Sequence, residues 1–492
     1  MVQNKLIIRL LRQLVFCLAL PGAYAVAVTT LDLPDIGEST GTILSPEYER
    51  RLGQAFLNQI RRQTDIIDDP EIETYIESLG YRLVAQSDNS SQRFTFFVID
   101  DNEINAFAAP GGIVGINAGT IINSETESEL AGVMAHEIVH VTQRHMARNA
   151  EMQQKMSIPM MAAMLGAILI ATQNPDAGQA ALAVVQGTAM QAQINFTRAN
   201  EEEADRIGIQ LLERAEFDPN GMPAFFEKLQ QNSRYTANAP EFLRTHPLTS
   251  NRIADTRARA EAMPNDGPYN ESTSYQFIRT KLMVKSYNYP GDAVKHYKNI
   301  IDQGEFRDDI VTLRYGLALA YLENKDYTAA SQLLESLLEK DKENMSMLLA
   351  RAEVDVRQGN YDGAIKIYQD MKHIYPDYRP LILSYANTLL TAKRPDEARE
   401  VLADYGKYHT PDITYYGYLA RAEAEAGNTI ESTMANAEYY FLTGETLIAI
   451  DQLRGILRQR DPKPDYYQEE RIMSRISQLE QELKIERNLK LR

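Results

Sequence analysis

The chain has 492 residues, more than one hydrophobic core usually supports, so at least two domains are expected. Hydrophobic residues make up 44% of the chain and charged residues 24%, a balance typical of a soluble globular protein. The formal net charge of −17 argues against binding to nucleic acid and against simple electrostatic binding to anionic lipid.

Residues 1–25 are predicted to be a secretory signal peptide. Three basic residues come first, an apolar run follows at residues 14–20, and a small-residue motif suited to cleavage ends at Ala25. The apolar run is well short of the ~20 residues that a membrane-spanning helix needs, which favours cleavage over an uncleaved anchor. The single cysteine, Cys17, lies inside this segment, so the mature chain would have neither disulfides nor cysteine metal ligands. Loss of three basic and no acidic residues would change the net charge from −17 to −20.

Two short β-strands are predicted at residues 93–100 and 111–117, joined by the segment DNEINAFAAP. The second strand, GGIVGIN, is expected to be an exposed edge of its sheet. An unfolded substrate could add to this edge as another strand, with Gly112, Ile113 and Val114 as the contact residues and main-chain hydrogen bonds supplying the affinity. The alternative is a buried central strand.

The segment VMAHEIVHVTQRH lies within a helical pattern that runs from residue 127 to residue 150. His136 and His140 are four residues apart on this helix, so both imidazoles project from one face toward a single metal ion. Glu137 is about 100° round the helix from His136, close enough to reach a metal-bound water without being a ligand. This is the HExxH arrangement of zinc peptidases, and the small and apolar neighbours argue against two solvated surface histidines.

His145 and Glu201 are the candidates for a third ligand. His145 lies five residues after His140, about 140° away on the helix, and is therefore expected to be structural. Glu201 falls on the buried stripe of a helix predicted at residues 200–212, where an unpaired carboxylate is costly and zinc is a suitable partner. Asp205, one turn later on the flank of the same face, could hydrogen-bond a ligand histidine and fix its tautomer.

The apolar segment IPMMAAMLGAILIA, residues 158–171, is too short to span a bilayer readily, so a buried or cleft-covering helix is expected. Its methionines could offer an adaptable surface to substrates or to a membrane face, although core packing is the ordinary explanation. Further on, a stretch rich in Pro, Gly, Asn and Ser at residues 261–274 predicts a domain boundary.

A period of 34 residues follows this boundary and predicts paired helices. The positions that share a phase are Ala318, Ala352, Ala386 and Ala420; Ala330, Ala364 and Ala398; Tyr327 and Tyr361; and Leu334, Tyr368 and Leu402. Small residues let paired helices approach closely, and large residues fill the groove between them. The pattern resembles the tetratricopeptide repeat, with Gly359 at its turn and Pro376 as its terminating proline. Such repeats present an extended concave surface, and the aromatic-rich residues 412–427 are the predicted partner contact.

Four segments in order, NAFAAPGG, HEIVH, NEEEAD and THPLTSNR, followed by tetratricopeptide repeats, resemble the HtpX-like gluzincin family and its periplasmic members in Gram-negative bacteria. The resemblance covers essentially the whole mature chain. It implies one Zn²⁺ per chain, held by His136, His140 and Glu201, with Glu137 as the general base.

The resemblance also implies a double function in the periplasm. The protein would degrade misfolded or stalled outer-membrane proteins and would promote the assembly of correct ones, including the lipopolysaccharide-export barrel. Its partners would be the β-barrel assembly machinery and outer-membrane β-barrel proteins, with peripheral contact to the outer membrane as a further expectation. The alternative is a non-catalytic repeat scaffold or chaperone, but a decayed peptidase would have no reason to keep Glu137 beside both histidines.

The expected fold is mainly α. An α+β zincin-like metallopeptidase domain with a small sheet would occupy residues 26–262, a linker residues 263–272, and an α-helical tetratricopeptide-repeat solenoid residues 273–492.

His246 is the only histidine between the HExxH region and the repeats, and the proline after it disfavours a helix at that point. Three roles are open: a surface histidine that caps a loop, a donor to the transition-state oxyanion, and a ligand that occupies the open position of zinc in the resting enzyme. We favour the third role, in which His246 regulates the site and must move before substrate can be cleaved.

Overall fold

The computed structural model describes residues 45–153, 160, 175–235, 240–264, 269, 271–304, 310–459 and 463–488. The predicted signal peptide lies outside these residues, as does the apolar segment 158–171 apart from Met160. None of the described helices is both long enough and apolar enough to cross a membrane.

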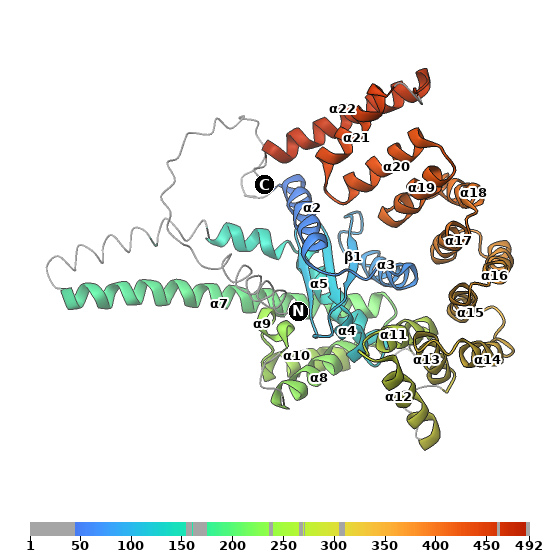
Figure 1. Ribbon diagram of the computed structural model, residues 1–492. Coiled ribbons are helices and arrows are strands. Elements are labelled where there is room, and N and C mark those ends of the chain that lie inside the picture. Colours follow the sequence, from blue (N-terminus) through green and yellow to red (C-terminus); the bar gives the residue numbers. More distant parts are fainter. Residues whose placement is uncertain are drawn as a thin grey trace. The chain divides into compact units, whose positions relative to one another are not determined.

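The front part of the chain combines helices with a three-stranded sheet (Figure 1). Its helices are α2 (Pro46–Gln63), α3 (Pro70–Val84), α4 (Ala118–Asn123), α5 (Glu127–Thr142), α7 (Pro175–Arg214), α8 (Gly221–Tyr235), α9 (Glu241–Thr245) and α10 (Ser250–Glu261). Its strands are β1 (Thr95–Ile99), β2 (Ala106–Ala109) and β3 (Ile113–Asn117). The sheet order is β1-β3-β2, with β3 parallel to β1 and antiparallel to β2.

The prediction that Gly112, Ile113 and Val114 form an exposed edge is wrong, because β3 is the central strand and all its residues are buried. Part of the segment expected to be a connection is itself the strand β2, which forms a hairpin with β3. Gly111 and Gly112 make the tight reversal possible, since both adopt positive φ angles, +77° and +85°, that favour glycine. The alternative reading, a buried central strand, is the correct one.

Helix α5 begins where the sequence predicts a helix but ends earlier. Thr126 caps it by accepting a hydrogen bond from the backbone N–H of Glu129. The predicted helix was continuous to residue 150, whereas α5 ends at Thr142 and Arg144 adopts a left-handed φ of +53°. The chain is helical again over residues 145–153, so His145 does not continue the spiral of α5.

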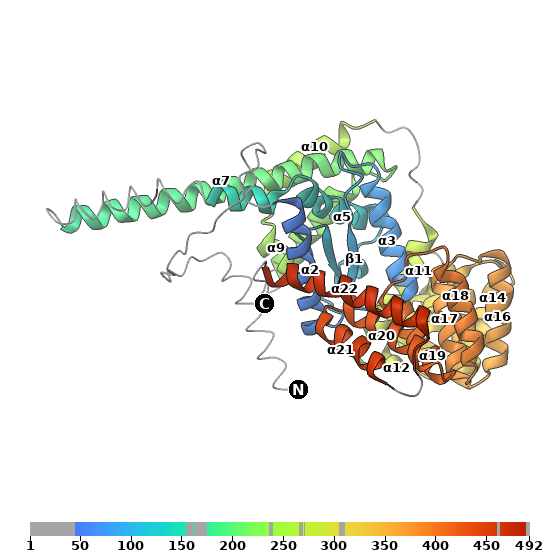
Figure 2. The same cartoon turned by 90° about the horizontal axis from the view of Figure 1, so that it is seen from above.

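The helix predicted at residues 200–212 is the last part of the 40-residue helix α7, which extends well beyond the sheet (Figures 1 and 2). The acidic residues 201–203 therefore lie far from the start of this helix. Attraction to its N-terminal dipole cannot explain them, because that effect fades within the first turn.

The repeat region consists of successive helix pairs, as the 34-residue period predicts. They are α11 (Thr273–Lys285), α12 (Pro290–Gln303), α13 (Ile310–Glu323), α14 (Tyr327–Leu338), α15 (Met345–Gln358), α16 (Tyr361–Ile374), α17 (Arg379–Thr391), α18 (Pro395–Gly406), α19 (Ile413–Glu425), α20 (Thr429–Leu442), α21 (Thr446–Arg458) and α22 (Tyr466–Asn488). All seven alanines of the two periodic phases are buried. Gly359 ends α15 with a left-handed φ of +79°, which confirms its predicted place in a turn.

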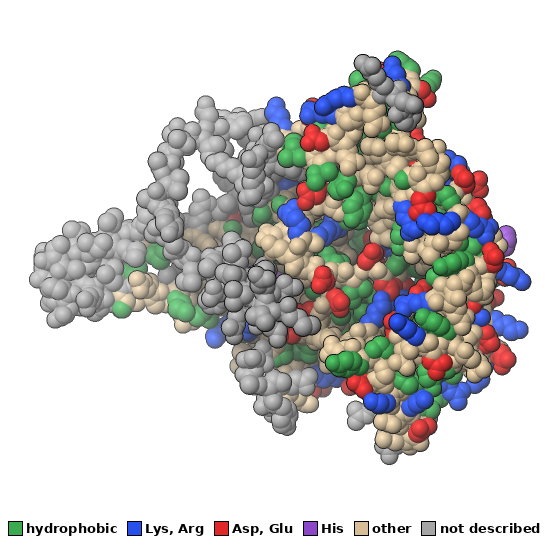
Figure 3. Space-filling model, in the orientation of Figure 1, with side chains coloured by type: hydrophobic (Ala, Val, Ile, Leu, Met, Phe, Trp, Pro, Cys, Tyr) green, Lys and Arg blue, Asp and Glu red, His purple; other side chains and the backbone are tan. Residues whose placement is uncertain are grey.

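Charged side chains of both signs are interspersed over the repeats on the face that Figure 3 shows. Several of them pair between neighbouring repeats, as in Arg357 with Glu323 at 3.2 Å and Arg394 with Asp362 at 3.2 Å. Because these pairs are exposed, each contributes little to stability.

The repeats and the front part belong to one compact unit, Ile43–Arg492. The predicted linker, residues 263–272, lies between α10 and α11, yet α11 places Tyr275, Ile278 and Leu282 in the hydrophobic core of the front part. Helix α3 packs against α17 of the repeats as well as against α11.

Ion pairs strengthen this junction. Lys281 lies 2.9 Å from a carboxylate oxygen of Asp69 and 2.8 Å from one of Glu71, and Arg379 contacts Glu73 at 2.8 Å.

Candidate metal centre

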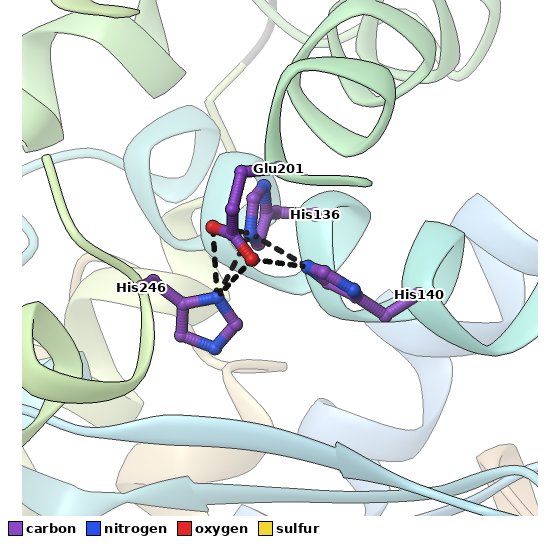
Figure 4. A group of neighbouring side chains, drawn as sticks. All are labelled: His136, His140, Glu201 and His246. Carbon is purple, nitrogen blue, oxygen red and sulfur yellow. Dashed lines mark hydrogen bonds and ion pairs between the residues drawn. The ribbon is translucent and has the colours of Figure 1, made fainter. Parts of the chain in front are cut away.

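Helix α5 places two histidines side by side in the interior of the front part (Figure 4). The Nε2 atoms of His136 and His140 lie 3.0 Å apart. His136 is fully buried, and the side chain of His140 is 14% exposed. The helical spacing of the HExxH motif therefore brings both imidazoles to one point, as predicted.

Glu201 of α7 and His246 complete a group of four. The carboxylate oxygens of Glu201 lie 3.4 Å from Nε2 of His136 and 3.4 Å from Nε2 of His140. His246 follows the short helix α9 and points its Nδ1 at the same place, 3.1 Å from both oxygens of Glu201 and 3.3 Å from Nε2 of His136. Within the described residues, one ligand atom from each side chain lies within 4.8 Å of all the others.

These separations fit a tetrahedral metal ion. Zinc bonds to imidazole nitrogen and carboxylate oxygen are about 2.0–2.1 Å long, so the donors of a tetrahedral site are about 3.3–3.4 Å apart. The distances between donor atoms given above run from 3.0 to 3.4 Å. The atoms of the whole group lie within 4.8 Å of one another, so the four side chains can gather around one metal ion with only small shifts.

The electrostatics of the group also favour a cation. Burial opposes the negative charge of Glu201, but His246 and His136 outweigh it and hold the pKa of this carboxyl well below its ordinary value. Burial, together with the neighbouring His136, holds the pKa of His140 well below the ordinary value for histidine. An ionised Glu201 and a neutral His140 are the protonation states that metal ligation requires.

His136 shows the same preference for positive charge. Burial alone would lower its pKa, but the close carboxylates of Asp205 and Glu201 outweigh burial and raise it to about 10. The two carboxylates that stabilise a proton on this imidazole also stabilise a metal cation beside it.

Glu137 is fully buried beside the group and is not one of the four ligand candidates. Neither of its carboxylate oxygens has a hydrogen-bond partner within the described residues, and Oε1 lies 3.4 Å from Nε2 of His246. Leaving a buried carboxylate without a donor is costly, which points to a functional reason for its place.

Asp205 lies where the sequence predicts, with Oδ1 3.0 Å from Nδ1 of His136. The structure adds a residue that the sequence argument missed. Arg252 donates two hydrogen bonds of 2.8 Å to the carboxylate of Asp205 and lies 3.0 Å from Glu201. The same guanidinium donates to the backbone carbonyl of Pro247, which ties the loop of His246 to the group. The arginine ends the quoted segment THPLTSNR, but sequence spacing alone could not reveal its partners.

Phe242 is the second missed residue. Its ring stacks on the imidazole of His246 at a centroid distance of 4.8 Å and an interplanar angle of 29°, so the helix α9 orients that imidazole.

Comparisons with known proteins agree with this geometry. Residues 70–260 match peptidase family M48, and residues 315–379 and 355–422 match tetratricopeptide repeats. The chain is 37% identical over 453 residues to the "Beta-barrel assembly-enhancing protease" of Escherichia coli. The aligned region covers 91% of each of the two chains.

A "Putative beta-barrel assembly-enhancing protease" of Vibrio cholerae is 36% identical over 431 residues, covering 86% of this chain and 88% of the relative. A more distant relative, the "Mitochondrial metalloendopeptidase OMA1" of Schizosaccharomyces pombe, is 27% identical and covers 50% of this chain and 69% of its own.

Proposed function

We propose that this chain, which belongs to the beta-barrel assembly-enhancing proteases of peptidase family M48, is a zinc endopeptidase of the bacterial periplasm. The observation that carries the proposal is the buried group of His136, His140, Glu201 and His246. Beside it lies the carboxylate of Glu137, which accepts no hydrogen bond within the described residues.

His136, His140 and Glu201 would hold the ion, and Asp205 and Arg252 would keep His136 and Glu201 in place. Zinc with three protein ligands supplies a Lewis acid that polarises a peptide carbonyl and lowers the pKa of water toward about 7. Glu137 would accept the proton of the attacking water on a carboxylate oxygen and pass it to the leaving amine.

We propose β2 as the strand that receives the substrate. Within the described residues β2 pairs with β3 and with no other strand, so its outer edge is open to a further strand there, and α5 packs against it. Ile104, two residues before β2, accepts a hydrogen bond from the backbone N–H of Phe242, which ties this edge to the helix α9 that precedes His246. Main-chain pairing along β2 would bind unfolded chains with little sequence preference.

His246 would act as the gate of this site. Its Nδ1 occupies the fourth position of the donor group, where it would exclude the attacking water. Movement of α9 and of the loop after it would free that position, and the stacked Phe242 and the bond from Arg252 to Pro247 hold the loop in the closed arrangement.

The clients would be outer-membrane β-barrel proteins. The names of the relatives, the predicted signal peptide and the repeat array support a peptidase that degrades stalled barrels and assists the assembly of correct ones. We include the lipopolysaccharide-export barrel among the clients, the β-barrel assembly machinery among the partners, and peripheral contact with the outer membrane.

Metal analysis combined with a casein cleavage assay tests the catalytic part of the proposal. Glu137→Gln should keep zinc and fold normally but should lose cleavage by roughly 10²–10⁴-fold, because an amide cannot accept the proton of the attacking water. Undiminished turnover in this variant would refute the assignment. The matched control is Glu202→Gln, since Glu202 is exposed on α7 and should leave both zinc content and turnover unchanged.

A further inference from the structure

His145 lies next to the metal centre although its position in the sequence places it on another side of the helix. On an uninterrupted helix it would lie about 140° away from His140. The left-handed conformation of Arg144, φ +53°, breaks the helix between the two residues. As a result, Nδ1 of His145 lies 2.8 Å from Nδ1 of His140.

The other side of the His145 ring meets a carboxylate. Its Nε2 lies 3.2 Å from a carboxylate oxygen of Glu203, which also accepts a hydrogen bond of 2.7 Å from Arg148. His145 itself is buried, 3% exposed, whereas the side chain of Glu203 is 26% exposed. The ring is thus held between a candidate metal ligand and an anion.

The geometry allows only one proton arrangement if His140 binds a metal. His140 faces Glu201 with Nε2, so this nitrogen must keep its lone pair and the proton must be on Nδ1. That proton is donated to Nδ1 of His145, which must accept and therefore carries its own proton on Nε2. The Nε2–H of His145 in turn donates to Glu203.

We propose that His145 is a positioning residue for the metal site. It accepts a hydrogen bond from Nδ1 of His140, and Glu203 holds its ring in place by accepting a hydrogen bond from its Nε2–H. This inference rests on the proposed function, because it assumes that His140 binds the ion. Each of the two histidines is then supported by its own carboxylate from α7. Asp205 contacts His136 directly, and Glu203 supports His140 through His145. The outer partners of metal-bound histidines orient the ring, and their loss typically weakens metal binding by 10–100-fold.

Two substitutions at residue 145 separate the positioning role from a packing role. The Oδ1 atom of asparagine can replace the acceptor Nδ1, whereas the Nε2 atom of glutamine replaces only the donor toward Glu203. We expect His145→Asn to bind zinc within about threefold of the parent, and His145→Gln to bind roughly 10–100-fold more weakly. Competition with a chelating indicator measures both affinities on the full chain.

A second readout is the visible absorption of the cobalt-substituted protein, which reports ligand geometry directly. It should be shifted in His145→Gln and unchanged in His145→Asn. Thermal unfolding of the metal-free variants should show no matching difference, since a packing role would affect both substitutions alike. Glu203→Ala should weaken zinc binding to about the same small extent as His145→Asn, because both variants keep the acceptor for His140 and lose only the contact with the Glu203 carboxylate. Glu202→Ala, at the exposed neighbouring residue on α7, should leave zinc binding unchanged.

Equal zinc affinities in His145→Asn and His145→Gln would overturn the inference, whether both match the parent or both are weakened. Loss of the metal in His140→Ala would show that the parent chain binds zinc through His140. If that result is found together with equal affinities in the two residue-145 variants, only the positioning role is overturned. A parent chain that binds no zinc would overturn the proposed function and the positioning role together.

Discussion

Tyr275→Ala should destabilise the metal-binding part of the chain, although Tyr275 belongs to the first helix predicted for the repeats. The ring is fully buried in the core that also contains Val133, Met134 and Ile138 of the metal-binding helix α5. Its hydroxyl lies 2.7 Å from the backbone carbonyl of Ser124, just before that helix.

The expected loss follows from these contacts. Removing a buried aromatic ring costs about 3–5 kcal/mol of unfolding free energy, and the lost hydroxyl adds about 1 kcal/mol. With a urea dependence of about 2.5 kcal/mol per molar, the unfolding midpoint should fall by about 2 M. Tyr275→Phe removes only the hydroxyl and should lower the midpoint by about 0.4 M.

Release of zinc during urea unfolding is the assay, because it reports the front part of the chain and not the repeats. The matched control is Tyr368→Ala, which removes an equally buried ring from the core of the repeats around α16 and α17. It should lower the stability of the repeats, seen by circular dichroism, and shift zinc release much less. An unchanged zinc-release midpoint in Tyr275→Ala would refute the shared core.

Three further substitutions test the centre itself. Glu201→Gln should lose zinc together with activity, because a neutral amide is a poor ligand; full zinc content in the purified variant would point to another carboxylate. His246→Ala should keep zinc and cleave casein about tenfold faster, which corresponds to a gate of about 1.4 kcal/mol; slower cleavage with zinc retained would favour the oxyanion role. Arg252→Leu should lower the unfolding free energy of the metal-free protein by about 3–5 kcal/mol in urea, since it leaves Asp205 buried without its cation; an unchanged value would show that this carboxylate is otherwise compensated.

The repeats were predictable because their evidence is local and periodic. A 34-residue spacing of small residues is sufficient to place helix pairs, and the alanines at those positions are all buried. The same holds for His136 and His140, since the geometry of a helix alone brings residues four apart to one face. Glu201 was found by a related argument, because its place on an apolar stripe predicted burial and burial required a partner.

Contacts between distant segments were not predictable in this way. The edge assignment of β3 failed because strand order depends on pairing with β2, and a short AFAA segment carries too little pattern to be recognised as a strand. The place of α11 in the front core was hidden for a similar reason: a change in composition at residues 261–274 marks a loop, but it does not say which core the next helix joins.

The sequence by itself therefore determined the features that follow from local periodicity. These are the two histidines on one helix face, the buried carboxylate of a later helix, and the repeat array. Only the tertiary structure decided how the centre is completed and supported. One left-handed residue, Arg144, turns His145 back toward His140. The fold also brings His246 to Glu201 from 45 residues away and Arg252 to Asp205 from 47 residues away. No local periodicity encodes such approaches, because they depend on how whole helices pack against one another.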